Sequence, residues 1–183
     1  MPAPSAQMTA PEVQALLKDG ALAGEWVLNP DRSSIRLTTK SMGLIPVKGA
    51  FREVGGHGGV AEDGRVSGTV TVAAASIDTR NKRRDTHLRS ADFFNCEAHP
   101  DITFTADDAR PSGQGVVVTG ALTVGGQTRP MSFDATVSVQ DGGDIWLDAT
   151  VAVNRADFGL TWNPLGIVGV SNTLAIHAVF TKW

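Results

Sequence analysis

The stretch that decides the fold is Ser76–Phe104, SIDTRNKRRDTHLRSADFFNCEAHPDITF, which separates two runs of alternating apolar and polar residues. It is too long and too polar for a hairpin turn, and connections of this length inside a compact domain are usually lids or binding segments. Within it, Leu88, Ala91 and Phe94 recur at a spacing of three, which predicts a short helical piece that turns these side chains inward. We therefore interpret Ser76–Phe104 as a partly helical cover over a cavity, and call it the cover.

The cover also carries acidic and basic residues in close alternation. Exposed ion pairs contribute only about 0 to 1 kcal/mol each, so their expected task is to fix the geometry of the loop. The aspartates and arginines expected to pair with one another are Asp78, Asp85 and Asp92 with Arg80, Arg83, Arg84 and Arg89.

On both sides of the cover, apolar residues recur with a period of two, which is typical of half-buried β-strands. Eight segments follow this pattern, and eight antiparallel strands with one apolar face each need a common interior, either a two-sheet sandwich or a closed barrel. Small residues on the inner faces leave room in a barrel, although they also permit the close sheet approach of a sandwich. The segments begin near Ile35, Val47, Val66, Ile102, Val116, Met131, Ile145 and Leu174, and the small inner residues are Gly49, Gly68, Ala74, Ala106, Gly120, Ala135, Ala149 and Ala178.

Several motifs in and after the cover resemble one known family. They occur in that family's order, and together they make the chain similar, over roughly residues 24–183, to the YceI-like family of polyisoprenoid-binding proteins. The motifs are Ser76-Ile-Asp-Thr79, Arg84-Asp85-x-His87-Leu88, Ser90-x-Asp92-Phe93-Phe94, Pro100-x-Ile102-x-Phe104, Gly120-Ala-Leu-Thr-Val-Gly-Gly-Gln-Thr-Arg-Pro130 and Arg155-x-Asp157-Phe158-Gly159.

The resemblance implies an all-β fold, an eight-stranded antiparallel lipocalin-like barrel with an extended apolar interior tunnel. Before the barrel, Thr9 and Glu12 have the spacing of a capping box, and Val13, Leu16 and Leu17 form one apolar stripe, so we expect a short helix that covers a barrel end or an edge strand. The expected organisation is an N-terminal tail and helix over residues 1–23, packed on a barrel domain over residues 24–183.

Composition narrows the class of protein. The chain has 183 residues, 42% of them hydrophobic and 19% charged, which is typical of one globular domain. A net charge of -3 gives no reason to expect nucleic acid, and no apolar run is long enough to span a membrane. The start, MPAPSAQMTAPEVQ, lacks the basic and apolar regions of a secretory signal that many members of the resembled family carry, so we expect a cytoplasmic protein. A homodimer stays open.

The reactive side chains do not form a recognisable catalytic or metal site. His57 lies in Gly55–Gly59, which we interpret as a glycine-rich turn, and the four histidines lack the spacing of zinc ligands. Cys96 has His87 and His99 near it in sequence, but an activated thiolate also needs an orienting third group. We therefore expect no metal, no catalytic residue and no cofactor other than a bound isoprenoid lipid.

The aromatic and aliphatic residues carry the binding hypothesis. Tyrosine is absent and the inner faces show no obvious charged group, so the interior is suited to an apolar chain. The predicted ligand-binding residues are Ile35, Leu37, Phe51, Val70, Val72, Leu88, Phe93, Phe94, Phe104, Leu122, Phe133, Leu147, Val151, Phe158, Trp162 and Ile176. Arg80, Arg83 and Arg84 are predicted to meet a polar head group at a mouth formed by the cover and the connection Asp157–Val170, in which Gly159, Gly166 and Gly169 permit movement.

These features favour non-catalytic binding, storage or transport of a long-chain polyisoprenoid or isoprenoid quinone. Three alternatives remain at this stage. The ligand could be a fatty acid or fatty amide, the protein could be an enzyme that acts on such a lipid through His87, Asp85 or Cys96, or the barrel could be a stress-related structural module with a filled core.

Overall fold

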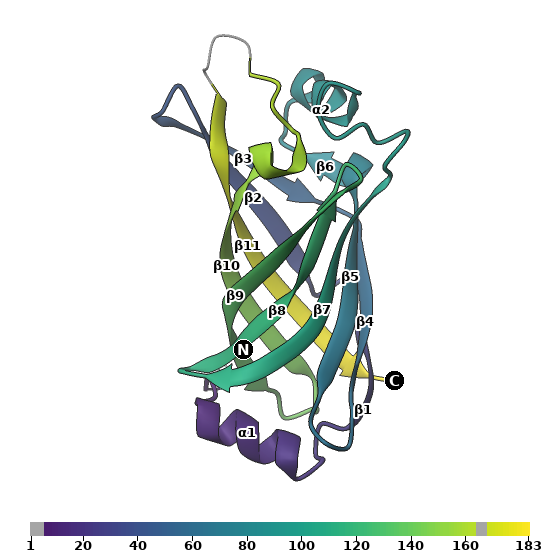
Figure 1. The fold of residues 1–183 in the computed structure, drawn as a ribbon, viewed down its shortest axis with the longest axis vertical. Coiled ribbons are helices and arrows are strands. Elements are labelled where there is room, and N and C mark those ends of the chain that lie inside the picture. Colours follow the sequence, from purple (N-terminus) through teal and green to yellow (C-terminus); the bar gives the residue numbers. More distant parts are fainter. Residues whose placement is uncertain (1–5, 164–167) are drawn as a thin grey trace.

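The fold is described from a computed structural model, which covers residues 6–163 and 168–183. Its strands form one antiparallel sheet that closes on itself through the pairing of β1 (Gly24–Leu28) with β11 (Val168–Lys182). Figure 1 shows the resulting upright barrel, with α1 (Ala10–Lys18) across one end and α2 (Lys82–Arg89) at the other. The predicted closed eight-stranded barrel is confirmed, and the sandwich is excluded.

Eight barrel strands arise from eleven strand segments of the described chain because three strands are each interrupted once. β1 and β2 (Ser34–Ser41) follow each other along the same edge of β11, and β3 (Ile45–Phe51) and β4 (Val54–Val60) run beside them. The third interrupted strand consists of β5 (Val66–Ala73), which pairs with β4, and β6 (Ile77–Asp78), which pairs with β3. The five uninterrupted strands are β7 (Asp101–Ser112), β8 (Gly115–Val124), β9 (Gln127–Val139), β10 (Ile145–Asn154) and β11.

Ser76 joins two of these interruptions. It ends η1 (Ala74–Ser76), and its hydroxyl oxygen accepts hydrogen bonds from the backbone N–H groups of Arg52 and Glu53, each at 3.1 Å, at the break between β3 and β4. The same hydroxyl donates to the carbonyl oxygen of Ala73 at 2.6 Å. One side chain therefore satisfies backbone groups that the broken ladders leave free.

The glycine-rich run Gly55–Gly59 belongs to strand β4, so its interpretation as a turn is wrong. A side chain at Gly56 would place its Cβ 2.7 Å from the carbonyl oxygen of Thr69, and one at Gly58 would lie 2.8 Å from that of Ser67. Glycine is needed here because β4 and β5 approach too closely for a Cβ atom.

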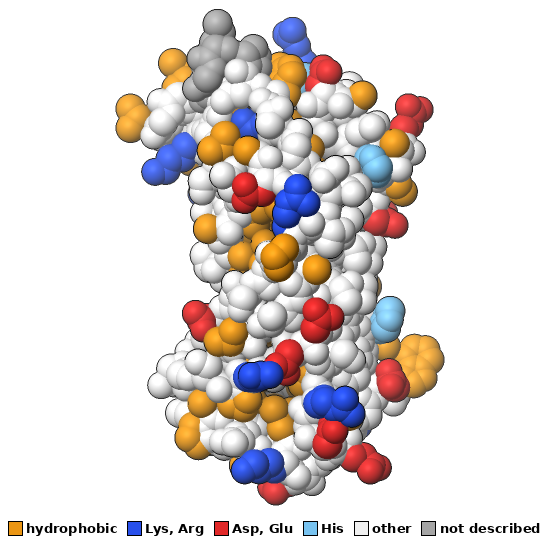
Figure 2. All heavy atoms as spheres, in the orientation of Figure 1, with side chains coloured by type: hydrophobic (Ala, Val, Ile, Leu, Met, Phe, Trp, Pro, Cys, Tyr) orange, Lys and Arg blue, Asp and Glu red, His pale blue; other side chains and the backbone are white. Residues whose placement is uncertain are grey.

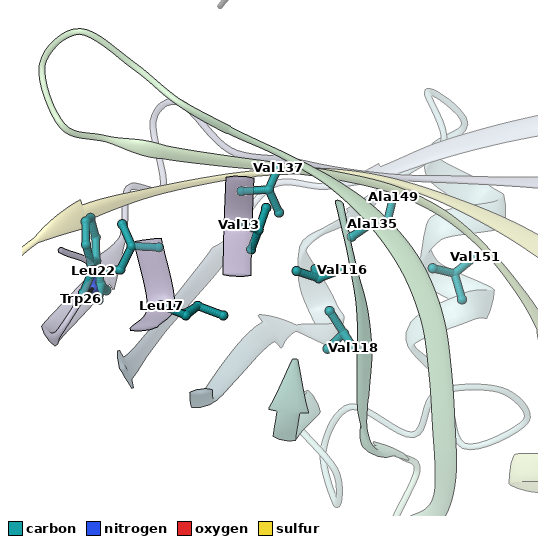
Figure 3. Packing of buried hydrophobic residues seen from close by; sticks show 10 residues of the cluster. All are labelled: Val13, Leu17, Leu22, Trp26, Val116, Val118, Ala135, Val137, Ala149 and Val151. Atoms are coloured by element: carbon teal, nitrogen blue, oxygen red, sulfur yellow. Dashed lines mark hydrogen bonds between the residues drawn. The ribbon is translucent and has the colours of Figure 1, made fainter. Parts of the chain in front are cut away.

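The N-terminal helix begins after Thr9, whose backbone N–H and hydroxyl both donate to the carboxylate of Glu12, at 2.7 and 2.8 Å. Val13 and Leu17 are buried, and Gly20 follows the helix with a φ of 69°. Figure 3 shows both side chains pointing to the barrel end beside Val137. The expected capping box and barrel-end helix are both present.

Candidate functional site

The barrel encloses a cavity of about 860 Å³ that extends from α1 to α2. Its walls are overwhelmingly apolar and come from every barrel strand. Each aliphatic and aromatic residue that the sequence predicts as ligand-binding lines this cavity. That they contact a ligand stays a prediction, but the tertiary structure brings them to one continuous surface.

The closed end of the cavity is built on α1. Val13 and Leu17 pack with Leu22 and Trp26 against the inner faces of the strands, and all four line the cavity. The indole N–H of Trp26 donates to the carbonyl oxygen of Leu22 at 2.9 Å, so this polar atom is satisfied although it is buried. The sequence predicted the helix but did not assign its residues to the site.

The middle of the cavity is narrowed by aromatic rings and widened by small residues. Phe104 and Phe133 lie 5.4 Å apart between their ring centroids, and Gly68 and Ala106 line the wall beside them. Gly120 does not serve to leave space in the cavity. A Cβ added there would lie 2.0 Å from the carbonyl oxygen of Thr105, so glycine is needed for the close approach of the two strands. The expectation that every small inner residue provides cavity space is therefore wrong.

At the other end, the cover lies over the opening. Phe94 packs edge-on against Phe51 at 6.1 Å and against Phe93 at 4.9 Å, and Leu88 lines the cavity beside them. Ala91 is exposed, because α2 ends at Arg89 before the predicted spacing can reach it. We call this end of the barrel the mouth.

The cover is anchored at Thr79. Its backbone N–H and its hydroxyl both donate to the buried carboxylate of Asp85, at 3.0 and 2.6 Å, and its hydroxyl and carbonyl oxygens accept from the guanidinium of Arg84, at 2.8 and 3.1 Å. Asn81 caps α2 by accepting a hydrogen bond from the backbone N–H of Arg84 at 3.0 Å. Thr79 thereby links the end of β6 to the first turns of α2.

The expected pairing of acidic and basic residues within the cover is wrong. Arg89 donates to the carbonyl oxygens of Ala75 and Ile77, at 2.7 and 2.9 Å, while Asp78 forms an ion pair with Arg52 of the β3–β4 break at 2.8 Å. Hydrogen bonds from the backbone N–H of Arg80 and from Arg52 lower the pKa of the Asp78 carboxyl. The cover is tied to the barrel rather than neutralised within itself.

Arg155, at the start of η2 (Arg155–Phe158), holds the connection opposite the cover. Its buried guanidinium donates to the carbonyl oxygens of Gly169 at 3.2 Å, Trp162 at 3.2 Å and Val168 at 3.3 Å, and also to that of Leu160. Burial lowers the pKa of this group. One side chain therefore joins the loop after η2 to the first residues of β11.

Arg155 also connects this loop with the cover. Its guanidinium lies over the ring of Phe93, 5.5 Å from the centroid, and Trp162 packs against His87 of α2 with ring centroids 4.1 Å apart and ring planes tilted by 49°. The two predicted sides of the mouth are thus in contact. Of the predicted hinge glycines, Gly159 has a φ of 76°, Gly169 lies in β11, and Gly166 lies outside the described residues.

The three predicted head-group arginines are placed differently. Arg83 and Arg84 line the cavity, whereas Arg80 is exposed and does not. Since Arg84 is engaged by Thr79, Arg83 is the residue whose guanidinium has freedom to meet a ligand. Arg155 also lines the cavity, so the inner surface carries charge that the sequence did not indicate.

The reactive side chains lie in structural environments. Burial raises the pKa of the Cys96 thiol, which keeps it protonated and weakly nucleophilic. Asp85 is held by Thr79, and His177 by Asp148 at 2.6 Å on the outer face of the barrel. Within residues 6–163 and 168–183 no three His, Cys, Asp or Glu residues gather as metal ligands, and no helix of this part of the chain is long and apolar enough to cross a membrane.

Fold and cavity together define a class, a lipocalin-like β-barrel with one apolar interior and a covered mouth. A family model described as the YceI-like domain matches residues 26–181. A UPF0312 protein of Pectobacterium atrosepticum is 31% identical over 151 residues, which are 77% of this chain and 78% of that protein. The protein YceI of Escherichia coli O157:H7 is 40% identical over 77 residues, 42% of this chain and 40% of its own. This chain belongs to the YceI-like family.

Solved structures agree with this fold. The crystal structure of BcnA from Burkholderia cenocepacia superposes with a TM-score of 0.76 at 23% identity, over 83% of this chain and 98% of BcnA. A polyisoprenoid-binding domain from Saccharophagus degradans, implicated in plant cell wall breakdown, superposes with a TM-score of 0.71 at 13% identity, over 86% of this chain and 98% of that domain. At these identities the likeness concerns the fold.

Proposed function

We propose that this protein binds a long-chain isoprenoid lipid, such as a polyprenyl lipid or an isoprenoid quinone, inside the barrel and stores or carries it without chemical change. The observation that carries the proposal is the cavity of about 860 Å³ with apolar walls that continues from α1 to the mouth. Apolar cavities of this kind gain little from water, so an apolar ligand is the occupant that the walls favour. The same cavity argues against a structural module with a filled core.

The shape of the cavity favours a slender, flexible chain. β11 has 15 residues, which correspond to about 50 Å along the strand, and the lining residues reach from α1 at one end of the barrel to α2 at the other. Each buried methylene contributes about 0.8 kcal/mol, so about twenty buried carbons outweigh an association cost of up to about 15 kcal/mol. A chain of four or more isoprene units meets that requirement, by order of magnitude.

The family supports the isoprenoid class, since a neighbour of the same fold is a polyisoprenoid-binding domain. A fatty acid or fatty amide is the rival ligand, because smooth apolar walls distinguish chains mainly by length and branching. Arg83 at the mouth would meet carbonyl or phosphate oxygens of either head group.

Non-catalytic binding is favoured over an enzyme by the state of the candidate groups. The Cys96 pKa is raised by burial, and Oδ1 of the Asp85 carboxylate accepts hydrogen bonds from both the N–H and the hydroxyl of Thr79. A nucleophile needs a neighbouring base and an orienting group, whereas His87 Nε2 has no hydrogen-bond partner among the described residues and Asp85 Oδ1 accepts from Thr79. The cytoplasmic location and the homodimer stay predictions.

Native mass spectrometry of the freshly purified full chain tests the proposal. We expect a co-purified lipid whose mass identifies an isoprenoid chain and its head group. If the co-purified lipid has a straight acyl chain, the ligand is the rival fatty acid or fatty amide and not an isoprenoid. A protein that neither retains nor takes up a lipid would contradict the proposal. An isoprenoid quinone or a fatty amide incubated with the protein should be recovered unchanged. Turnover by the parent that disappears in His87→Ala or Cys96→Ser would show instead that the protein is an enzyme.

A further inference from the structure

The turn between β2 and β3 exposes an unusual number of apolar side chains. Its tip is Met42–Ile45, in which Met42 is 66% exposed, Leu44 86% and Ile45 57%. Turns of this kind are normally formed by polar residues and glycine, and exposed apolar groups that gather at one place mark an interaction surface. Met42 and Gly43 have φ angles of 53° and 72°, so the tight turn is formed by two consecutive residues in the left-handed region.

This tip lies at the mouth of the cavity. Ser41, beside it, pairs with Val168 at the start of β11, and Trp162 and Val170 at the same end are 40% and 43% exposed. Ser41, Val168 and Trp162 also line the cavity, so the exposed apolar surface continues into the cavity wall. Among the described residues, the other exposed large apolar side chain is Trp183, in the C-terminal part of the chain away from the mouth.

The flanking charges are of one sign. Between Arg32 and Arg52 the chain has basic residues but no Asp or Glu. Arg32 and Arg52 are engaged by Asp144 and Asp78, whereas Lys40 and Lys48 are exposed on the two strands of the hairpin. Figure 2 shows hydrophobic and basic side chains next to one another at this end of the molecule. The exposed acidic residues of the cover and of η2 are Asp92, Glu97, Asp101 and Asp157.

The spacing between the tip and the lysines matches the depth of a membrane interface. Lys40 precedes Met42 by two residues and Lys48 follows Ile45 by three, so the lysines start about 7 and 10 Å behind the tip. Apolar groups of interfacial proteins are buried about 5 to 10 Å into the boundary between head groups and acyl chains. A tip inserted to that depth brings both ammonium groups to the level of the phosphates.

We propose that the mouth end of the barrel docks on an anionic lipid bilayer, with Met42–Ile45 and Trp162 in the interface and Lys40 and Lys48 against the phosphates. This surface goes beyond the proposed cavity ligand, and it would let an apolar chain pass between bilayer and cavity without crossing water. The bilayer is favoured over a second copy of the chain because the surface joins an apolar rim to basic residues and opens into an apolar cavity.

Sedimentation of the full chain with extruded vesicles tests docking without any cavity ligand. In an assay with vesicles of phosphatidylcholine containing about 30 mole per cent phosphatidylglycerol, we expect the parent to sediment with the vesicles. It should bind vesicles of phosphatidylcholine alone much more weakly. Leu44→Ser/Ile45→Ser should lower the partition coefficient about tenfold or more. Lys40→Ala and Lys48→Ala should each lower it about fivefold, and high salt should reduce this effect.

Trp183→Ser is the matched control, because it removes the exposed apolar side chain away from the mouth and should bind vesicles as the parent does. The proposal is overturned if the parent ignores anionic vesicles, if the Leu44→Ser/Ile45→Ser variant binds like the parent, or if the control loses as much. If the parent is a dimer that does not bind vesicles, and the double variant is a monomer, the surface serves self-association instead. Uptake of detergent-dispersed quinone by the double variant, measured separately, distinguishes lost docking from a lost cavity.

Discussion

Replacing Ala106 with phenylalanine should obstruct the cavity partway along the barrel. Ala106 lines the cavity from β7 and pairs with Gly68 on one side and Gly120 on the other, so a ring placed there lies over neighbours without side chains. Gly120 itself cannot be used for this test, since its Cβ would collide with the carbonyl oxygen of Thr105 at 2.0 Å. Ala149 is unsuitable as well, because it is buried in the packed core.

The magnitude follows from the length of chain that the ring displaces. A phenyl ring takes the room of about four methylene groups, each of which contributes about 0.8 kcal/mol when buried, so a long chain should bind about 3 kcal/mol more weakly. This corresponds to an increase of about 150-fold in Kd. β7 begins at Asp101 near the mouth, and Ala106 lies about 17 Å further along the strand, so a short chain should fit in front of the ring.

Binding can be followed by quenching of tryptophan fluorescence with isoprenoid quinones of eight and two prenyl units, because Trp26 and Trp162 both line the cavity. Thr105→Phe is the matched control, since it adds the same ring to an exposed position of the same strand. We expect Ala106→Phe to lose affinity for the long quinone and to keep it for the short one. If a well-folded Ala106→Phe binds both quinones like the parent, the ligand does not extend past the middle of the barrel.

Three further predictions concern the mouth and the two ends of the fold. Arg83→Ala should weaken binding of a polyprenyl phosphate by about 1.5 to 3 kcal/mol and leave a headless hydrocarbon unaffected, whereas Arg80→Ala, off the cavity, should change neither in the same titration. Arg155→Met should lower the free energy of unfolding, measured in urea, by about 3 kcal/mol, because several half-buried or buried carbonyl oxygens lose their donor; an unchanged midpoint would contradict this structural role of Arg155. Hydrogen bonds from Thr9 lower the pKa of the Glu12 carboxyl, so their stabilisation is complete above the ordinary value of 4.5 and is lost as the pH falls through the lowered folded-state pKa. The protection factors of the α1 amides, which express exchange relative to the intrinsic rate at each pH, should therefore fall in acid in the parent, while those of Glu12→Gln should show little change over the same pH range.

Much of the barrel could be predicted from local pattern. Alternation with a period of two assigned Phe104, Phe133 and Ile176 to inner faces, and each of them lines the cavity. This succeeds because successive side chains of a strand point to opposite faces, whatever the rest of the chain does. The same criterion could not identify the strand at Gly55–Gly59, since glycines carry no periodic signal and this strand depends on the close approach of β5.

The candidate site could be predicted only in its apolar part. The sequence could not show that Arg84 is engaged by Thr79 or that Arg155 reaches two carbonyl groups of the loop after η2 and two at the start of β11. The reason is that the hydrogen-bond geometry of a guanidinium depends on where the chain returns in space. The motif Arg155-x-Asp157-Phe158-Gly159 was the available sequence signal for this residue. It indicated membership of a family and did not show which groups Arg155 contacts.

By itself, the sequence determined antiparallel strands with one apolar face each and a capped helix before them, since these features depend on periodicity and capping within short segments. The choice of a closed barrel over a sandwich rested on the resemblance to the YceI-like family. Tertiary structure alone decided that three strands break at neighbouring levels, that Ser76 links two of those breaks and Thr79 links β6 to the cover helix, and that one apolar hairpin tip lies beside the mouth. The physical reason is that each of these features is a contact or an exposure set by residues distant in the chain. Backbone groups freed by an interrupted strand must find partners wherever the fold provides them.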